Sequence, residues 1–235
     1  MNIVYYDSLA STNDEAKKRG FVGAPHLFCV AAATQTAGRG RLGRRFLSPT
    51  GGTYFSVVLR PTLPRADYGV ITPICAVAVH RALVRITGIA PEIKWVNDLL
   101  LDGKKLCGIL SEATSDQNGD PFVVLGIGIN TGRGPLPLEI ADIATALPVD
   151  DKNALIIAVL EELSLLDDAF LTGEWCDYYR RYAAFLGHSV TLTDEKGSQC
   201  VKALDIDGRG GLVAELADGT VTTLYGGEIS LRQNK

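Results

Sequence analysis

No stretch of apolar residues in this chain reaches the roughly 20 positions that a membrane-spanning helix needs. The first residues, Met1-Asn2-Ile3, do not begin a signal peptide. The chain also contains no low-complexity segment and no internal repeat. We therefore expect a cytoplasmic, globular protein that has no membrane as a partner.

Cysteine is scarce and has no pattern that would indicate a disulfide framework or a zinc site. The five cysteines are an odd number, they are widely spaced, and no Cys-x-x-Cys pair occurs. Most lie within apolar sequence, where a free thiol behaves as a small buried hydrophobic group. We expect free thiols and a reducing cytosol. The five are Cys29, Cys75, Cys107, Cys176 and Cys200.

Positive charge is not in surplus. Lysine and arginine total 23 against 27 aspartates and glutamates, which gives a net charge of −4. A general nucleic-acid-binding protein presents a whole basic face to its partner. We therefore expect no DNA partner, and any cluster of arginines is a local positive island on an acidic protein.

The 235 residues are enough for one substantial domain and a small second one. The first 187 residues mix expected strands (2–6, 27–33, 54–59, 92–101 and 121–130) with expected helices (11–20, 72–87, 151–171 and 174–186). After Gly187 the chain changes to short alternating segments separated by Gly- and Asp-rich turns, which indicates a small β-barrel. We predict an α+β fold with domains at 1–187 and 188–235.

A loop of three glycines and four arginines lies between two apolar strands, at residues 35–46. Glycine lets the backbone approach a ligand closely, and arginine supplies fixed positive charge and forked donors for carboxylate or phosphate. The loop is neither a P-loop nor a dinucleotide-binding fingerprint, because the required spacing is absent. It predicts an anion cradle, and a solvated basic turn stays open as the alternative.

Polar residues interrupt an otherwise apolar strand at Lys94, Asn97 and Asp98. Buried charge is costly unless it is paired or used. The Asp102-Gly103 pair predicts a hairpin, and we expect this hairpin to make the strands that carry Lys94 and Lys105 neighbours. Either lysine alone would most often be solvated, but two beside an Asn-Asp pair indicate a site.

Three small polar residues, Ser11, Thr12 and Asn13, stand where a helix is expected to begin. They fit a plain helix cap, and they also fit hydrogen bonding to a small polar head group. His80 lies in the middle of an expected helix with no second metal-type ligand at helical spacing, so we interpret it as structural.

Together these motifs resemble those of the biotin protein ligases, in the same order and across nearly the whole chain. The matching stretches are Ser11-Thr12-Asn13, Gln35, Gly38-Arg39-Gly40-Arg41-Leu42-Gly43-Arg44, Lys94-Trp95-Val96-Asn97-Asp98, Lys105-Leu106-Cys107-Gly108-Ile109-Leu110, Glu112, Gly126-Ile127-Gly128-Ile129-Asn130 and Gly226-Gly227-Glu228-Ile229-Ser230. The resemblance implies a mixed-sheet catalytic domain followed by a small SH3-like β-barrel. It also implies ATP- and Mg²⁺-dependent activation of biotin to biotinyl-5′-AMP, and transfer to a lysine of a biotin carboxyl carrier domain of acetyl-CoA carboxylase or a related carboxylase.

The resemblance also implies roles for individual residues. The implied biotin-binding residues are Ser11, Thr12, Asn13, Gln35, Gly38, Arg39, Gly40, Arg41 and Lys105. The implied nucleotide-binding residues are Arg39, Arg41, Phe46, Lys105 and Asn130. The implied catalytic residues are Arg41, Lys94, Asp98 and Lys105, and Asp98 is alternatively a structural partner of Lys94.

The chain departs from the family pattern at two positions. The family commonly has Trp where Phe46 stands, which leaves a smaller aromatic platform for adenine, and Pro where Val96 stands. Because the Ser-Thr-Asn motif begins at residue 11, we expect neither the N-terminal DNA-binding domain of many relatives nor a repressor function. A homodimer is implied by the family alone.

Three other functions stay open on the sequence. A lipoate or octanoate ligase shares the chemistry, although the Gly-Arg-Gly-Arg loop and the Lys-Trp-x-Asn-Asp motif favour biotin. A non-catalytic nucleic-acid-binding module would use the arginine loop and the small barrel, against the acidic net charge. A biotin sensor would bind biotin without forming an adenylate.

Overall fold

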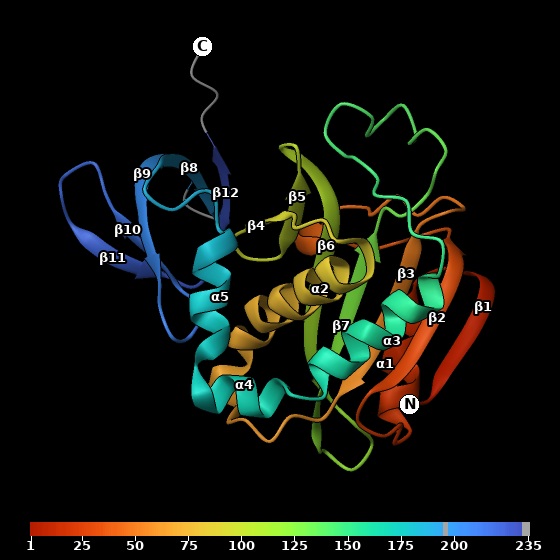
Figure 1. Cartoon of the computed structure of the whole chain (residues 1–235). Helices are drawn as coiled ribbons and strands as arrows, with labels where there is room; N and C mark the ends of the chain where they lie inside the picture. Colours follow the sequence, from red (N-terminus) through yellow and green to blue (C-terminus); the bar gives the residue numbers. More distant parts are fainter. Residues whose placement is uncertain (195–196, 232–235) are drawn as a thin grey trace.

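A computed structural model describes residues 1–194 and 197–231, which form two sheets flanked by helices (Figure 1). The larger sheet has seven strands in the order β1-β2-β3-β7-β6-β5-β4. Its strands are β1 (Ile3–Leu9), β2 (Phe28–Gln35), β3 (Thr53–Leu59), β4 (Glu92–Lys94), β5 (Asp98–Leu101), β6 (Lys104–Ser115) and β7 (Pro121–Ile129). β1 runs parallel to β2, whereas all other neighbours are antiparallel. This mixed sheet is the α+β architecture that the sequence predicts.

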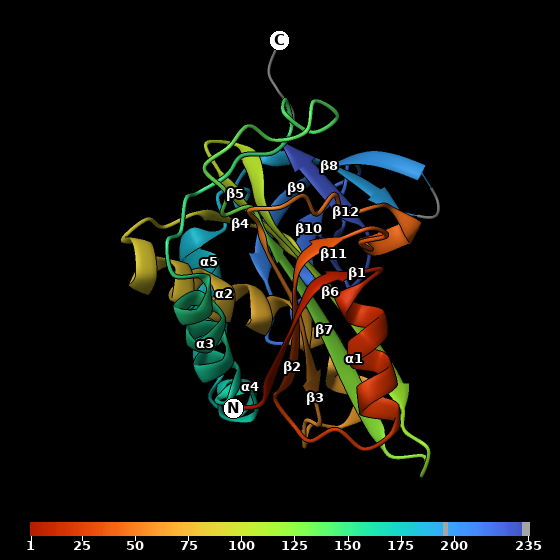
Figure 2. The same ribbon diagram turned by 90° about the vertical axis from the view of Figure 1, so that its right-hand side faces the viewer.

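Helices cover both faces of the larger sheet (Figure 2). α1 (Thr12–Phe21) lies on one face; the other is covered by α2 (Ile71–Thr87), α3 (Lys152–Leu163), α4 (Leu166–Thr172) and α5 (Glu174–Tyr182). Successive strand residues point to opposite faces, so Val57 joins the large core under α2 while Val58 joins a small core with Ala16 of α1. The sheet is therefore buried on both sides, and its strands read as continuous apolar runs.

One helical segment corrects the expectation that no apolar run is long enough to cross a membrane. Residues Arg65–Thr87, which comprise a 3-10 turn and α2, pass by length and composition. In the fold, 67% of the most apolar part of this segment is buried. α2 packs against α3 and the sheet, which is the behaviour of the core helix of a globular protein.

The C-terminal region forms a five-stranded antiparallel sheet in the order β11-β10-β9-β8-β12. Its strands are β8 (Ser189–Asp194), β9 (Gly197–Ile206), β10 (Leu212–Glu215), β11 (Val221–Leu224) and β12 (Glu228–Leu231). Its inward side chains, such as Leu192 and Leu212, belong to the same hydrophobic cluster as α2. Trp95 donates its indole N–H to the carbonyl of Gly210 at 3.0 Å, so the small sheet is fixed against the end of the large one.

Some element boundaries differ from the sequence-based expectations. α1 continues through Gly20 to the next residue, and Gly20 serves for close packing against the ring of Phe122 instead of ending the helix. The expected strand 92–101 is two strands, β4 and β5, joined at 95–97, where the chain leaves the strand direction to bury Trp95. The expected helix 151–171 is interrupted after α3, and the last helix ends at Tyr182.

All five cysteines are free, as expected. Four of them are buried and Cys200 is half-buried. Burial raises the pKa of the Cys29 thiol to about 12, so this group stays protonated and unreactive.

His80 is a buried structural histidine, as expected from the absence of a second metal-type ligand at helical spacing. Its Nε2 lies 2.8 Å from the carbonyl of Pro91 and its Nδ1 lies 2.9 Å from the hydroxyl of Tyr178. Since a carbonyl only accepts, the ring donates from Nε2 and accepts from Tyr178 at Nδ1. Burial lowers the pKa of His80 from 6.5 to about 4, so the folded protein holds the ring neutral.

We expect His80→Gln to flatten the acid side of the stability profile. His80 becomes protonated near pH 6.5 in the unfolded chain but only near pH 4 in the folded chain. The free energy of unfolding therefore decreases as the pH falls between these values. The shift corresponds to a loss of about 3 kcal/mol across that range. Urea unfolding at pH 7 and pH 4.5 measures it, and exposed His188→Gln is the control. Equal pH slopes for the parent and His80→Gln would contradict the prediction.

Candidate active site

Two adjoining cavities open between the arginine loop, the strand ends of the large sheet and β12. The larger has a volume of about 600 Å³ and the smaller about 50 Å³. The residues that line both are Gly40, Arg41, Phe46, Asn97 and Lys105. Arg41 and Lys105 therefore lie at the junction of the two cavities. Anionic groups that enter from either cavity would meet both cations there.

Every site residue expected from the sequence lines one of these cavities, apart from one glycine. The smaller cavity is lined by Ser11, Thr12, Asn13, Gln35, Arg39, Gly40, Arg41, Phe46 and Lys105. The larger is lined by Gly40, Arg41, Phe46, Lys94, Asp98, Lys105 and Asn130. The exception, Gly38, lies inside the loop, where its carbonyl accepts the backbone N–H of Phe46 at 2.9 Å.

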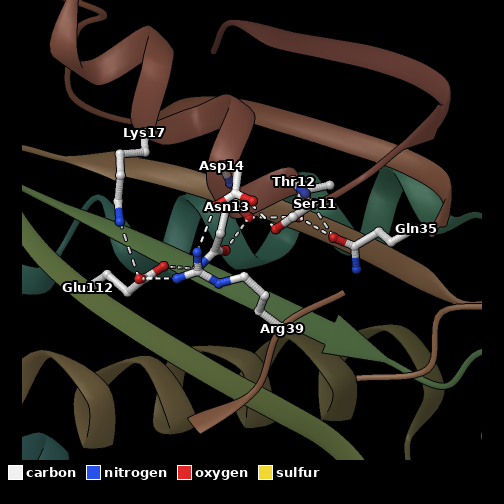
Figure 3. Close-up of polar contacts among 9 residues, drawn as sticks. Ser11, Thr12, Asn13, Asp14, Lys17, Gln35, Arg39 and Glu112 are labelled. Carbon is white, nitrogen blue, oxygen red and sulfur yellow. Dashed lines mark hydrogen bonds and ion pairs between the residues drawn. The ribbon is translucent and has the colours of Figure 1, made fainter. Parts of the chain in front are cut away.

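The start of α1 and the end of β2 form a hydrogen-bonded chain at the floor of the smaller cavity (Figure 3). The side-chain oxygen of Gln35 accepts the backbone N–H of Thr12 at 2.8 Å and its hydroxyl at 3.1 Å. The side-chain nitrogen of Gln35 donates to the hydroxyl of Ser48 at 2.8 Å. Ser11 caps the helix by accepting the backbone N–H of Asp14 at 3.4 Å, so its capping role and its position in the cavity coexist.

Asn13 reaches the sheet because β7 has a glycine beneath it. A Cβ added at Gly126 would lie 2.0 Å from the Asn13 side-chain oxygen, which no side chain tolerates. The buried hydroxyl of Ser56 lies 2.6 Å from that same oxygen and 2.7 Å from the hydroxyl of Thr12. The small residues on β3 and β7 therefore allow α1 to present its first turn to the cavity.

The Phe46 ring lies against the sheet at Gly108 of β6 and Gly128 of β7. A Cβ at Gly128 would approach the Phe46 ring to 2.5 Å. The Nζ atom of Lys105 lies 6.0 Å from the ring centroid, and Tyr54 meets the ring edge-on at a centroid distance of 6.3 Å. The aromatic platform expected from the sequence is thus present at the junction of the cavities.

The arginine loop is held against the protein by an acceptor for each of three arginines. Arg39 donates to Asp14 and Glu112. Arg41 donates to the Asn97 oxygen at 3.1 Å and to the carbonyl of Gly227 at 3.2 Å. Arg44 forms an ion pair of 2.7 Å with Glu228. Because these acceptors come from α1, β6, the turn at 95–97 and residues 227–228, the loop is fixed at several points of the protein.

The two lysines are arranged differently from the expectation. β5 lies between β4 and β6, so Lys94 and Lys105 are not neighbours. Lys105 Nζ lies 2.7 Å from Asp98 Oδ1, whereas Lys94 Nζ lies 3.8 Å from Glu228 Oε1. The proposed alternative partner of Asp98 was Lys94; the structure pairs Asp98 with Lys105 instead.

Asn130 is buried, and its amide is already engaged. Its side-chain nitrogen donates to the carbonyl of Lys105 at 3.3 Å and to the carbonyl of Thr145 at 3.1 Å. It therefore fixes the backbone of Lys105 and attaches residues 131–148 to the rim of the larger cavity.

Sequence reasoning assigned no role to three residues that shape the site: Asn97, Glu112 and Glu228. All three lie within stretches that were quoted for the family resemblance. The signal that could have identified Glu112 and Glu228 is charge, because the arginines of the loop need acceptors on the elements that face them. No group of three or more His, Cys, Asp or Glu side chains among the described residues is arranged to hold a metal ion.

Comparison with known proteins agrees with this architecture. Residues 5–130 match the Biotin/lipoate A/B protein ligase family, and residues 185–232 match the Biotin protein ligase C terminal domain. The chain is 33% identical to the bifunctional ligase/repressor BirA of Bacillus subtilis over 98% of this chain and 74% of that protein. It is 30% identical to the biotin–[acetyl-CoA-carboxylase] ligase of Mycobacterium tuberculosis, over 94% of this chain and 86% of the other.

A solved structure matches the whole chain. The biotin protein ligase from Aquifex aeolicus, in complex with biotin and ATP, superposes with a TM-score of 0.85 at 30% identity, covering 99% of both chains. The match extends over both sheets and includes the segments that form the two cavities. The chain belongs to the biotin/lipoate A/B protein ligase family.

Proposed function

We propose that this chain is an ATP-dependent biotin protein ligase. It activates biotin to biotinyl-5′-AMP and transfers the biotinyl group to a lysine of a carboxylase carrier domain. The observation that carries the proposal is the junction of the two cavities, where Arg41 and Lys105 face both. Two anionic substrates, one in each cavity, would meet at these cations.

The relatives favour biotin over lipoate as the acid. Curated relatives aligned over most of this chain are named as ligases of biotin to acetyl-CoA carboxylase, and the Aquifex structure holds biotin and ATP. We therefore assign the smaller cavity, with its polar floor of Ser11, Thr12, Asn13 and Gln35, to the biotin head group. The larger cavity, with Phe46 and Asn130, takes the nucleotide.

In the first step the biotin carboxylate attacks the α-phosphate of ATP and pyrophosphate leaves. Two anions at contact distance repel each other by several kcal/mol, about 4 at an effective dielectric constant of about 20. Lys105 and Arg41 offset this repulsion at the junction, and Lys94, which lines the larger cavity alone, offsets charge on the departing phosphates. Positioning both reactants in one closed site supplies the remaining advantage.

We propose that Mg²⁺ enters with the nucleotide. Mg²⁺ usually keeps several waters and binds one or two carboxylates together with substrate phosphates. Glu92 and Glu228 are carboxylates that line the larger cavity, so the residues fit a metal carried by ATP. When bound, the ion neutralises phosphate charge; the side chains described above orient the substrates.

The direct test is the mass of a biotin carrier domain after incubation with the enzyme, ATP, Mg²⁺ and biotin. We expect an increase by one biotinyl group on a single lysine, and no increase when ATP is omitted. Replacing biotin with lipoate is the matched arm. Labelling by lipoate and not by biotin would overturn the proposal, as would biotin binding with no adenylate formed.

We expect Arg41→Gly to release the reactive adenylate. Arg41 fixes the loop to Asn97 and to Gly227, the residue before β12, and the loss of these charge-assisted bonds should raise the rate of adenylate escape by about tenfold or more. Biotinylation of lysines on an added bystander protein, without carrier, measures the escape. Arg133→Gly is the control, because Arg133 also follows a glycine directly but lies outside both cavities. Bystander labelling equal to that of the parent would refute the prediction.

A further inference from the structure

Glu112 of β6 gathers donors from two separate parts of the site without lining either cavity (Figure 3). Its Oε2 accepts the side-chain N–H of Asn13 at 3.0 Å. Its Oε1 accepts from Arg39 of the loop and from Lys17 of α1, the latter at 3.3 Å. The carboxylate is only 20% exposed, so these contacts are partly shielded from water.

The contact with Asn13 fixes the direction of a carboxamide in the wall of the smaller cavity. Ser56 occupies the oxygen end of that carboxamide and Glu112 occupies its nitrogen end. Since a flipped amide would place its oxygen against the Glu112 carboxylate, which only accepts, the observed orientation is the favourable one. The remaining lone pair and N–H of the Asn13 amide therefore have fixed directions and can bind a polar head group in the smaller cavity.

The contact with Arg39 fixes the first arginine of the loop. Its guanidinium forks between Asp14 of α1, at 2.8 Å, and Glu112 of β6. Although burial alone acts to raise it, hydrogen bonds from Asn13 and Lys17 and the charge of Arg39 lower the pKa of Glu112, so the group is ionised and both oxygens accept. One carboxylate thus joins the wall of the smaller cavity to the loop that covers it.

We propose that Glu112 is a positioning residue that couples the orientation of Asn13 to the docking of the arginine loop through Arg39. It touches neither substrate. Its effect on biotin recognition rests on the proposed function, whereas its effect on the loop is a property of the ligand-free protein. The two effects can be measured separately.

The informative variant is Glu112→Gln, which preserves size and leaves one acceptor oxygen. That oxygen can serve Asn13 or Arg39 but not both, and the amide N–H₂ then faces a donor. We expect trypsin to cleave the ligand-free loop, which offers four arginines at Arg39, Arg41, Arg44 and Arg45, about tenfold faster than in the parent. We expect the KM for biotin to rise about tenfold with kcat changed by less than about twofold.

Lys17→Gln is the matched control, because Lys17 contacts the same carboxylate but neither Asn13 nor Arg39. It should leave both measurements near the parent values. Parent-like cleavage and KM in Glu112→Gln would overturn the proposal. So would a fall in kcat and thermal stability at unchanged KM, which is the result for a merely structural residue. An inactive parent enzyme would refute the proposed function, while the cleavage rates would still decide whether Glu112 docks the loop.

Discussion

Lys105→Ala should reduce adenylate formation by about 10²- to 10³-fold, the usual cost of removing a preorganised donor from a developing charge. Lys105 is a cation that lines both cavities, so it is placed to contact the biotin carboxylate and the α-phosphate together. Alanine also leaves the Asp98 carboxylate, which is 12% exposed, without its partner. Both effects act against the meeting of two anions.

The measurement is biotin-dependent exchange of pyrophosphate into ATP, which reports the first step alone. Lys104→Ala is the control: the side chain is next in sequence but exposed, and it donates to the carbonyl of Ala141 at 3.2 Å. Thermal unfolding of both variants separates a catalytic loss from a folding defect. Exchange by Lys105→Ala within about fivefold of the parent would mean that the junction of the cavities does not carry the reaction.

The sequence predicts the parts of this site that are continuous in the chain. The glycine and arginine spacing of residues 38–44 indicates an anion-binding loop, and the polar residues at the start of α1 are recognisable as a cap. In the structure all of these, apart from Gly38 and Gly43, line a cavity or hold the loop that covers it. The alternating pattern after Gly187 likewise predicts an all-β region, because strand periodicity is a local property.

Contacts across the sheet are not predictable in the same way. The hairpin at 102–103 correctly joins two strands, but it places Lys105 beside Asp98 and not beside Lys94. The reason is the turn at 95–97, which creates a further strand, and its driving force is the burial of Trp95 against the C-terminal sheet. A contact between segments 115 residues apart leaves no trace in local hydropathy.

The acceptors of the arginine loop illustrate the same limit. Glu112 and Glu228 are far from the loop in sequence, and each reads locally as a charged residue on a strand. Only the order of strands brings β6 and β12 to the loop and makes these carboxylates its partners. The sequence therefore predicts that the loop arginines need acceptors, but it does not predict which residues are those acceptors.

Asp98→Asn should slow transfer of biotin to the carrier by about 10²-fold while adenylate formation changes by less than about fivefold. The acceptor lysine of the carrier arrives mostly protonated, because a free lysine has a pKa of about 10.4. Asp98 is the carboxylate beside Lys105, at 2.7 Å, and it lines the larger cavity. It is therefore placed to orient the amine and take its proton. Asparagine has the same shape but lacks the negative charge that orients and deprotonates the amine.

Single-turnover transfer from preformed biotinyl-5′-AMP isolates the second step, and pyrophosphate exchange isolates the first. Asp102→Asn is the control, because Asp102 lies in the exposed hairpin turn with φ of 52°, where asparagine is equally tolerated. If Asp98 removes the proton of the acceptor amine, the loss of transfer rate in Asp98→Asn should become smaller as the pH rises towards 10. At that pH the amine loses its proton to solvent without the help of Asp98. If Asp98 only holds Lys105 in place, we expect Asp98→Asn to reduce the rates of adenylate formation and of transfer equally. The loss of transfer rate should then not change with pH.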